Sequence, residues 1–207
     1  RPMEGLVLTL GAIFFAFDLV FIFIGIGSLN QMSSSGEDLD TAGPIPMGWS
    51  NWNAKRIATI AIMMALSVVA TFIPIPSPSG TVALDLSPAY FMALYGGPIN
   101  GAITAIFGHL AVAIRAGFPL GVPVHLGIGI AAAGVGSALW YFTRRLTKSG
   151  MNPDSALVVG IIIAIIGNTF GTNILLSYIF IGVAMAIGTI PPIFIGSSAN
   201  VIIGAVV

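Results

Sequence analysis

The chain alternates between long apolar stretches and short breaks that are polar or rich in proline and glycine. The apolar stretches lie at about 5–28, 57–73, 88–95, 99–114, 124–142, 152–186 and 192–207. Residues 157–166 are apolar on every side, whereas a transmembrane β-strand alternates apolar and polar positions. A spanning helix needs about 20 mostly apolar residues, and tilted or protein-buried helices can be shorter. We therefore predict an all-α integral membrane protein with six or seven spans.

The first apolar stretch is separated from the others by a long polar segment. It contains Asp18 and lacks the basic start and small-residue cleavage site of a signal peptide, so we interpret it as a retained helix. Residues 30–53 carry a serine run, three acids and two prolines, a composition typical of an exposed linker. This divides the chain into an appended helix at 1–29, a polar linker at 30–53 and a six-helix body at 54–207. Asp18 is predicted to face a partner or a polar cavity rather than lipid.

Basic residues at the ends of the spans predict the topology. Lys55 and Arg56 precede four predicted spans, and Arg144, Arg145 and Lys148 follow them. An even number of spans puts both clusters on one side, which the positive-inside rule makes cytoplasmic. The loops near residues 74–80, 117–123 and 188–192 then share the outer side. Irregular backbone at membrane depth usually lines a cavity, so we expect an outward-opening pocket there. Simple helix termination by proline and glycine is the alternative.

Composition agrees with a membrane location and excludes several functions. The sequence is 57% hydrophobic and 7% charged, with a mean hydropathy of +1.03, whereas soluble domains carry about 25% charged residues. A formal net charge of zero argues against a nucleic-acid partner. The absence of cysteine excludes a thiol nucleophile and a thiolate metal site. No glycine- and lysine-containing phosphate loop is present, so the chain has no ATPase of its own.

Two charged residues near the predicted outer loops are candidate substrate-binding residues. Arg115 stands at the outer end of the third body helix, where it either binds a carboxylate or phosphate of a substrate or extends to lipid head groups. Asp85 opens the second body helix from the outer side. Three roles fit it equally: pairing with Arg115, contacting a ligand, or capping the helix.

Polar residues inside the spans complete the candidate set. His109 lies about two turns inward from Arg115, and His125 opens the next helix, where it suits a hydrogen bond to a ligand. Two histidines and one acid could suggest a metal site, but these residues lie on different helices, so we do not predict one. Four further polar residues lie in the last two spans and can bind cargo or tie helices together: Asn168, Thr172, Asn173 and Asn200.

Small side chains form a stripe on the first body helix. Ala54, Ala58, Ala61 and Ala65 follow one another at spacings of four, three and four, which places them on one face. Such a face lets another helix backbone approach closely. Ordinary packing inside the chain and docking of a partner both fit this pattern.

Several motifs together resemble the substrate-binding (S) components of energy-coupling factor (ECF) transporters. The pattern Ala61-Ile-Met-Met-Ala65 resembles the AxxxA motif of that family. The segment from Val82 to Ala102 resembles its second helix, with an apolar-Asp-apolar-Ser start and a Gly-Pro-x-x-Gly-Ala turn. His109 follows Gly108 where many members carry a Gly-acid pair, which is a departure, and the basic pair after the fourth span also fits. The resemblance covers about residues 53–207.

The resemblance implies a function. Members are six-helix proteins of prokaryotic cell membranes that bind vitamins or related micronutrients from outside. They are not enzymes, need no cofactor, and dock onto a transmembrane coupling subunit driven by two ATPases. It implies that Ala58, Ala61 and Ala65 face that subunit. Members for nickel and cobalt share a histidine close to the N-terminus, and this chain has none before His109, which disfavours a metal cargo. The alternative function is a structural membrane subunit of a larger enzyme complex.

Overall fold

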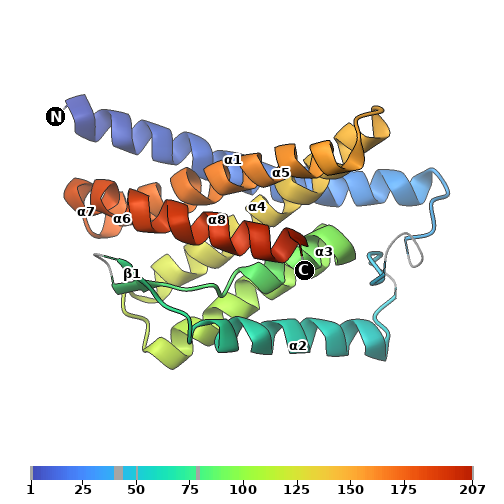
Figure 1. Ribbon diagram of the computed structural model, residues 1–207, viewed down its shortest axis with the longest axis horizontal. Coiled ribbons are helices and arrows are strands. Elements are labelled where there is room, and N and C mark those ends of the chain that lie inside the picture. The colour runs from blue at the N-terminus through green and yellow to red at the C-terminus, as the bar shows by residue number, and fades with distance from the viewer. Residues whose placement is uncertain (1, 40–43, 50, 78–79, 207) are drawn as a thin grey trace.

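The computed structural model describes residues 2–39, 44–49, 51–77 and 80–206, with residues 80, 81, 172 and 173 described by backbone only. The long helices lie side by side in one bundle (Figure 1). The elements are α1 (Pro2–Ser34), α2 (Ala54–Ala70), β1 (Ile75–Ser77), β2 (Gly80–Val82), α3 (Ser87–Ala116), α4 (Val122–Lys148), α5 (Pro153–Gly167), the π-helix η1 (Asn168–Thr172), α6 (Asn173–Phe180), α7 (Val183–Gly188) and α8 (Ile190–Val206). Helices α1, α3, α4 and the α5–α6 run are long and apolar enough to cross a membrane. The predicted all-α class is confirmed, with one short antiparallel hairpin, β1–β2, added.

Helix α3 is two antiparallel helical segments joined by a sharp reversal. Gly97 has φ 80° and ψ 169°, a backbone conformation that only glycine adopts without strain, and Pro98 starts the second segment. The two segments then touch, because a Cβ on Gly101 would lie 2.5 Å from that of Ala93. The predicted turn at residues 96–98 between two spans is therefore confirmed.

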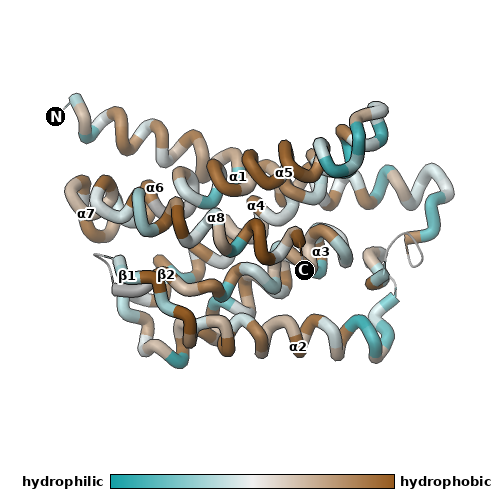
Figure 2. Tube along the Cα trace, in the orientation of Figure 1, coloured by the Kyte–Doolittle hydropathy of each residue, from teal (hydrophilic) through white to brown (hydrophobic). Residues whose placement is uncertain are grey.

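The bundle has one basic end and one end with irregular loops. Figure 1 shows the start of α2 and the α4–α5 turn at the same end, and Figure 2 shows hydrophilic residues gathered there. The β1–β2 hairpin and α7 lie at the opposite end (Figure 1). This arrangement agrees with the four-span count between the two basic clusters.

The predicted continuous helix at 152–186 is wrong in its second half. The helical hydrogen bonding widens to a π-helix at Asn168–Thr172, and the chain breaks at Gly182, which has φ 107°. A π-helix turn is rare and is frequently found at functional sites. Proline 191 was expected to break the chain, but it lies in the first turn of α8, where its missing N–H has no intrahelical acceptor in any case.

The predicted exposed linker at 30–53 is wrong for its described apolar residues. Leu39, Ile45 and Met47 are buried, and Met47 packs with Trp140 and Ile99. The segment is held by Arg56, which is fully buried rather than solvent-facing. Its guanidinium donates to the carbonyls of Gly48 and Asn51 and to the side chain of Asn100. The sequence pattern did not reveal this, because the buried residues are spaced irregularly among polar ones.

Asp18 of α1 is fully buried inside the chain. A Cβ on Gly171 would overlap one of its carboxyl oxygens, a Cβ on Gly134 would overlap its backbone carbonyl, and a Cβ on Gly167 would lie 3.1 Å from its other carboxyl oxygen. Within the described part of the chain, neither carboxyl oxygen has a hydrogen-bond partner. Asp18 thus avoids lipid as predicted, but it packs against glycines of its own chain, and these glycines explain how α1 approaches α4 and η1 so closely.

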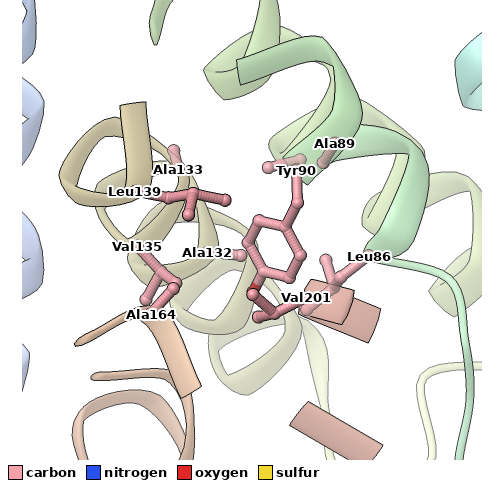
Figure 3. Packing of buried hydrophobic residues seen from close by; sticks show 10 residues of the cluster. Leu86, Ala89, Tyr90, Ala132, Ala133, Val135, Leu139, Ala164 and Val201 are labelled. Carbon is pink, nitrogen blue, oxygen red and sulfur yellow. The ribbon is translucent and has the colours of Figure 1, made fainter. Parts of the chain in front are cut away.

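The main hydrophobic core joins helices from both halves of the body. Tyr90 of α3 is fully buried and points among alanines and valines of α4, with Val201 of α8 against it (Figure 3). Small residues dominate this cluster, since alanine and glycine allow helices in membranes to pack at short distance. The core fixes how α3, α4 and α8 surround the pocket described below.

Replacing Gly134 with valine tests the contact between α1 and α4. The new side chain would overlap the backbone carbonyl of Asp18, which cannot rotate away, so we expect a loss of about 1–3 kcal/mol in stability. Thermal unfolding in detergent measures this. The control is Gly27→Ala on α1, where an added Cβ meets open space and should be neutral or slightly stabilising. Equal melting temperatures for Gly134→Val and the wild type would contradict the close approach.

Candidate binding pocket at the loop end of the bundle

A pocket of about 420 Å³ opens among α3, α4, η1, α6 and α8 at the end of the bundle that carries the hairpin. Its polar lining comes from side chains that lie far apart in the sequence: Thr71, Asp85, His109, Arg115, His125, Asn168, Ser177, Ser197 and Asn200. Valine, leucine and isoleucine side chains form most of the remaining wall. Its volume and its mixed lining fall in the range of sites for small organic ligands, about 300–1,000 Å³.

Three of the predicted residues form a chain of hydrogen bonds. The Nδ1 atom of His109 lies 2.6 Å from Oδ2 of Asp85, and its Nε2 atom lies 3.1 Å from Nδ1 of His125. All three side chains are buried. Of the three roles that the sequence left open for Asp85, pairing with Arg115 does not occur: Asp85 pairs with His109.

The protonation state of His109 decides in which direction the hydrogen bonds from Asp85 to His125 run. A neutral His109 donates from Nδ1 to the Asp85 carboxylate and accepts from His125, which leaves Nε2 of His125 as an acceptor. A protonated His109 donates at both nitrogens, and Nε2 of His125 then carries a proton and donates. In the structure as described, Nε2 of His125 is buried without a hydrogen-bond partner. The chain therefore ends on one polar atom that a ligand can satisfy as donor or acceptor.

Asn200 fixes the connector between β2 and α3, which carries Asp85. Its Oδ1 accepts from the backbone N–H of Leu86, and its Nδ2 donates to the carbonyls of Ala83 and Gly196, each at 2.9 Å. The amide oxygen and both N–H groups of Asn200 are thus bonded to backbone groups. Asn200 lines the pocket as predicted, but its described bonds position neighbouring residues.

Asn168 and Arg115 lie at different depths of the pocket. Asn168, at the first position of η1, donates to Oγ of Ser197 at 3.0 Å and is buried. Arg115 is exposed at the mouth, where it donates to Oγ1 of Thr71 at 3.1 Å and lies 4.7 Å from the ring centre of Phe72. Its guanidinium is thus partly engaged by its own chain.

The pocket gathers most, but not all, of the predicted residues. Asp85, His109, Arg115, His125, Asn168 and Asn200 line it. The side chains of Thr172 and Asn173 lie outside the described residues. Sequence reasoning missed Thr71, Ser177 and Ser197; of these, Ser197 lies three residues before Asn200, a helical spacing that indicates the same face.

No group of three or more histidine, cysteine, aspartate or glutamate side chains is arranged to hold a metal ion within the described ranges. The two histidines and Asp85 are adjacent, yet both nitrogens of His109 already point at hydrogen-bond partners. A zinc or nickel ion needs several ligand lone pairs that point at one position. The nitrogens of His109 point instead at Asp85 and His125.

The fold is shared with a solved structure described as "Structure and mechanism of the S component of a bacterial ECF transporter". The likeness has a TM-score of 0.54 and 24% sequence identity, and it covers 72% of this chain and 90% of that chain. At that identity it shows the fold alone. No curated protein sequence matches the chain.

The apolar spans and the fold define a multi-pass helical membrane protein, and its described residues enclose a polar cavity near the end that carries the hairpin. The family follows from the sequence itself. The model of the "ECF-type riboflavin transporter, S component" matches residues 51–207, so the chain belongs to that family. Helix α1 and most of the segment after it precede the matched residues.

Replacing Asn200 with leucine tests its role in building the pocket. The change leaves the N–H of Leu86 and the carbonyl of Ala83 without their partner, so we expect a loss on the order of 1–3 kcal/mol per unpaired group. The melting temperature in detergent should fall clearly. Ser198→Ala is the matched control, because Ser198 is half-buried on the same helix and its hydroxyl donates to the carbonyl of Phe194 in its own turn. If both variants melt alike, Asn200 does not hold the connector.

Proposed function

We propose that this chain captures a vitamin from the outer side of a prokaryotic cell membrane and delivers it to a separate coupling module with two ATPases. The observation that carries the proposal is the polar pocket at the loop end, opposite the basic end. The positive-inside rule makes the basic end cytoplasmic, so the pocket faces outward. The alternative function, a structural subunit of a larger complex, would use Asp18 as a partner contact. Asp18 is buried in its own chain, so it does not support that alternative.

The proposed cargo is riboflavin, the vitamin in the name of the family whose model the chain matches. Riboflavin joins a flat tricyclic ring, with carbonyl and N–H groups along one edge, to a chain bearing hydroxyls. The pocket offers complementary chemistry: apolar walls such as Val112 and Ile128 for the ring, and amide, hydroxyl and imidazole groups for the polar edge. Phe118 lies edge-on to His125, with ring centres 5.8 Å apart, which limits how the imidazole can turn.

The charge at the pocket supports a neutral cargo over an anionic one. Asp85 is paired with His109, and Arg115 at the mouth is partly engaged by Thr71 and Phe72. Within the described lining, Arg115 at the mouth is the only lysine or arginine, and His109 is paired with Asp85. Riboflavin, which is uncharged, suits this pocket better than its phosphate ester.

The alanine stripe of α2 is the proposed docking surface for the coupling subunit. Ala58, Ala61 and Ala65 are all exposed on α2, whereas Ile60 and Ser67 on another face of the helix are buried. A helix of the coupling subunit can approach the small side chains closely. The stripe is thus free for a partner, although packing inside the chain was the competing explanation of its spacing.

Riboflavin binding is tested with the purified chain in detergent, by quenching of the vitamin's fluorescence. Wild-type protein should bind it, and His125→Leu should weaken binding about tenfold or more, because the polar end of the Asp85–His109–His125 chain is lost. Arg115→Gln should leave riboflavin binding nearly unchanged. Native mass spectrometry that finds a different retained molecule, with no riboflavin bound, would refute the cargo while leaving the transport class intact.

Docking is tested by co-purification with the coupling subunit and both ATPases. Ala61→Trp and Ala65→Trp should reduce the recovered complex at least tenfold, since a bulky ring prevents close helix approach, while riboflavin binding persists. Leu66→Trp is the control: Leu66 is exposed on α2 but lies about 100° around the helix from Ala65. Complexes that survive both alanine substitutions would rule out this face as the docking surface.

A further inference from the structure

A second hollow, of about 550 Å³, lies between α1 and α4 at the basic end of the bundle. Its polar part is formed by Arg144, Arg145 and Lys148 in the last turns of α4, together with Gln31 of α1. It is separate from the cargo pocket and shares no lining residue with it. None of the features used for cargo binding or docking explains it.

The hollow carries more positive than negative charge. Glu37 is the acid paired with it: one carboxylate oxygen accepts from Arg144 and the other lies 3.2 Å from Nζ of Lys148. The Glu37 carboxylate thus contacts two of the three basic side chains that line the hollow. The pairing does not saturate Arg144 either, because its Nε has no acceptor within the described part of the chain. An anionic group is the natural complement to this arrangement.

The hollow also has an apolar part beside α1. Ile24, Trp140 and Tyr141 line it, and Gly27 leaves space, since a Cβ there would meet nothing within 4 Å. Phe23 and Val20, four and seven residues before Gly27 and so on the same face of α1, are 74% and 51% exposed. The basic side chains therefore lie at one end of an exposed apolar surface of α1, formed by Phe23 and Val20, which we call the apolar track.

We propose that this hollow binds an anionic phospholipid, with its phosphate head group at Arg144, Arg145 and Lys148 and an acyl chain along Val20 and Phe23. Basic pockets between transmembrane helices on the cytoplasmic side are sites of this kind. Tyr141, which is only half-buried, matches the membrane interface at this end of the bundle. An acidic protein segment would satisfy the charges, but it would leave the apolar track uncovered.

The site depends on the helix that the family model leaves out. Gly27 and Gln31 belong to α1, which precedes the matched residues 51–207. The basic residues come from α4, inside the matched region. The lipid would therefore bridge the additional helix and the body, and it would bind whether or not the proposed cargo is riboflavin.

Native mass spectrometry of the full chain in detergent tests the proposal with three probes: dioleoylphosphatidylglycerol, dioleoylphosphatidylcholine and inorganic phosphate. We expect one phosphatidylglycerol to be retained at least tenfold more tightly than phosphatidylcholine. Gly27→Leu should fill the hollow and reduce phosphatidylglycerol retention about tenfold. The matched control Gly5→Leu, at the far end of α1 where a Cβ also meets open space, should retain it fully.

A second variant tests the charges: Arg145→Gln combined with Lys148→Gln should abolish the preference for phosphatidylglycerol while riboflavin binding continues. Three outcomes would overturn the proposal. Equal retention of both lipids by the wild type excludes an anionic lipid site. Equal stabilisation by inorganic phosphate at millimolar concentration indicates a free anion instead. Normal lipid retention by both variants, with loss of the coupling subunit, indicates a protein-docking surface.

Discussion

The hydrogen bonds of Asn200 to the connector between β2 and α3 are the contacts on which the pocket depends. A connector without helical bonding leaves backbone N–H and C=O groups that lipid cannot satisfy. Asn200 supplies both a donor and an acceptor, bonding to Ala83 and Leu86. The connector is thereby held against α8, and Asp85 within it reaches His109 of the second half of α3. The polar chain from Asp85 to His125 thus follows from a backbone constraint.

Close helix approach through small residues is the second constraint, and it acts at both ends of the bundle. Gly134 and Gly171 admit the backbone and carboxylate of Asp18, so α1 packs against α4 although it precedes the family-matched body. Further along the same helix pair, Gly27 has no neighbour and a hollow remains. The glycine pattern of one helix pair therefore creates both a tight contact and an open site, at different depths of the membrane.

The sequence predicted much of the architecture and most of the pocket. The spans from Lys55 to Arg144, the turn at Gly97 and the common end of the irregular loops all follow from apolar length, proline and glycine, which act locally. The pairing partner of Asp85 was not predictable, because His109 and Arg115 lie on one helix, and the sequence does not show which depth and which face of that helix Asp85 meets. The burial of Arg56 and Met47 was also missed: Met47 and two of the hydrogen-bond partners of Arg56 lie in a segment whose composition is that of a linker.

The sequence by itself determined that the chain is a helical membrane protein and, through ordered motifs such as Ala61 to Ala65, its kinship with S components. Both depend on composition and on spacing along one chain. Only the tertiary structure decided which polar residues meet. The side chain of Asn200 bonds to the backbone, and Nε2 of His125 has no hydrogen-bond partner among the described residues. Three basic residues of α4 lie beside Gly27 of α1. The reason is that helices in lipid associate through shape and hydrogen bonding, and these depend on crossing depth and rotation, which no single helix encodes.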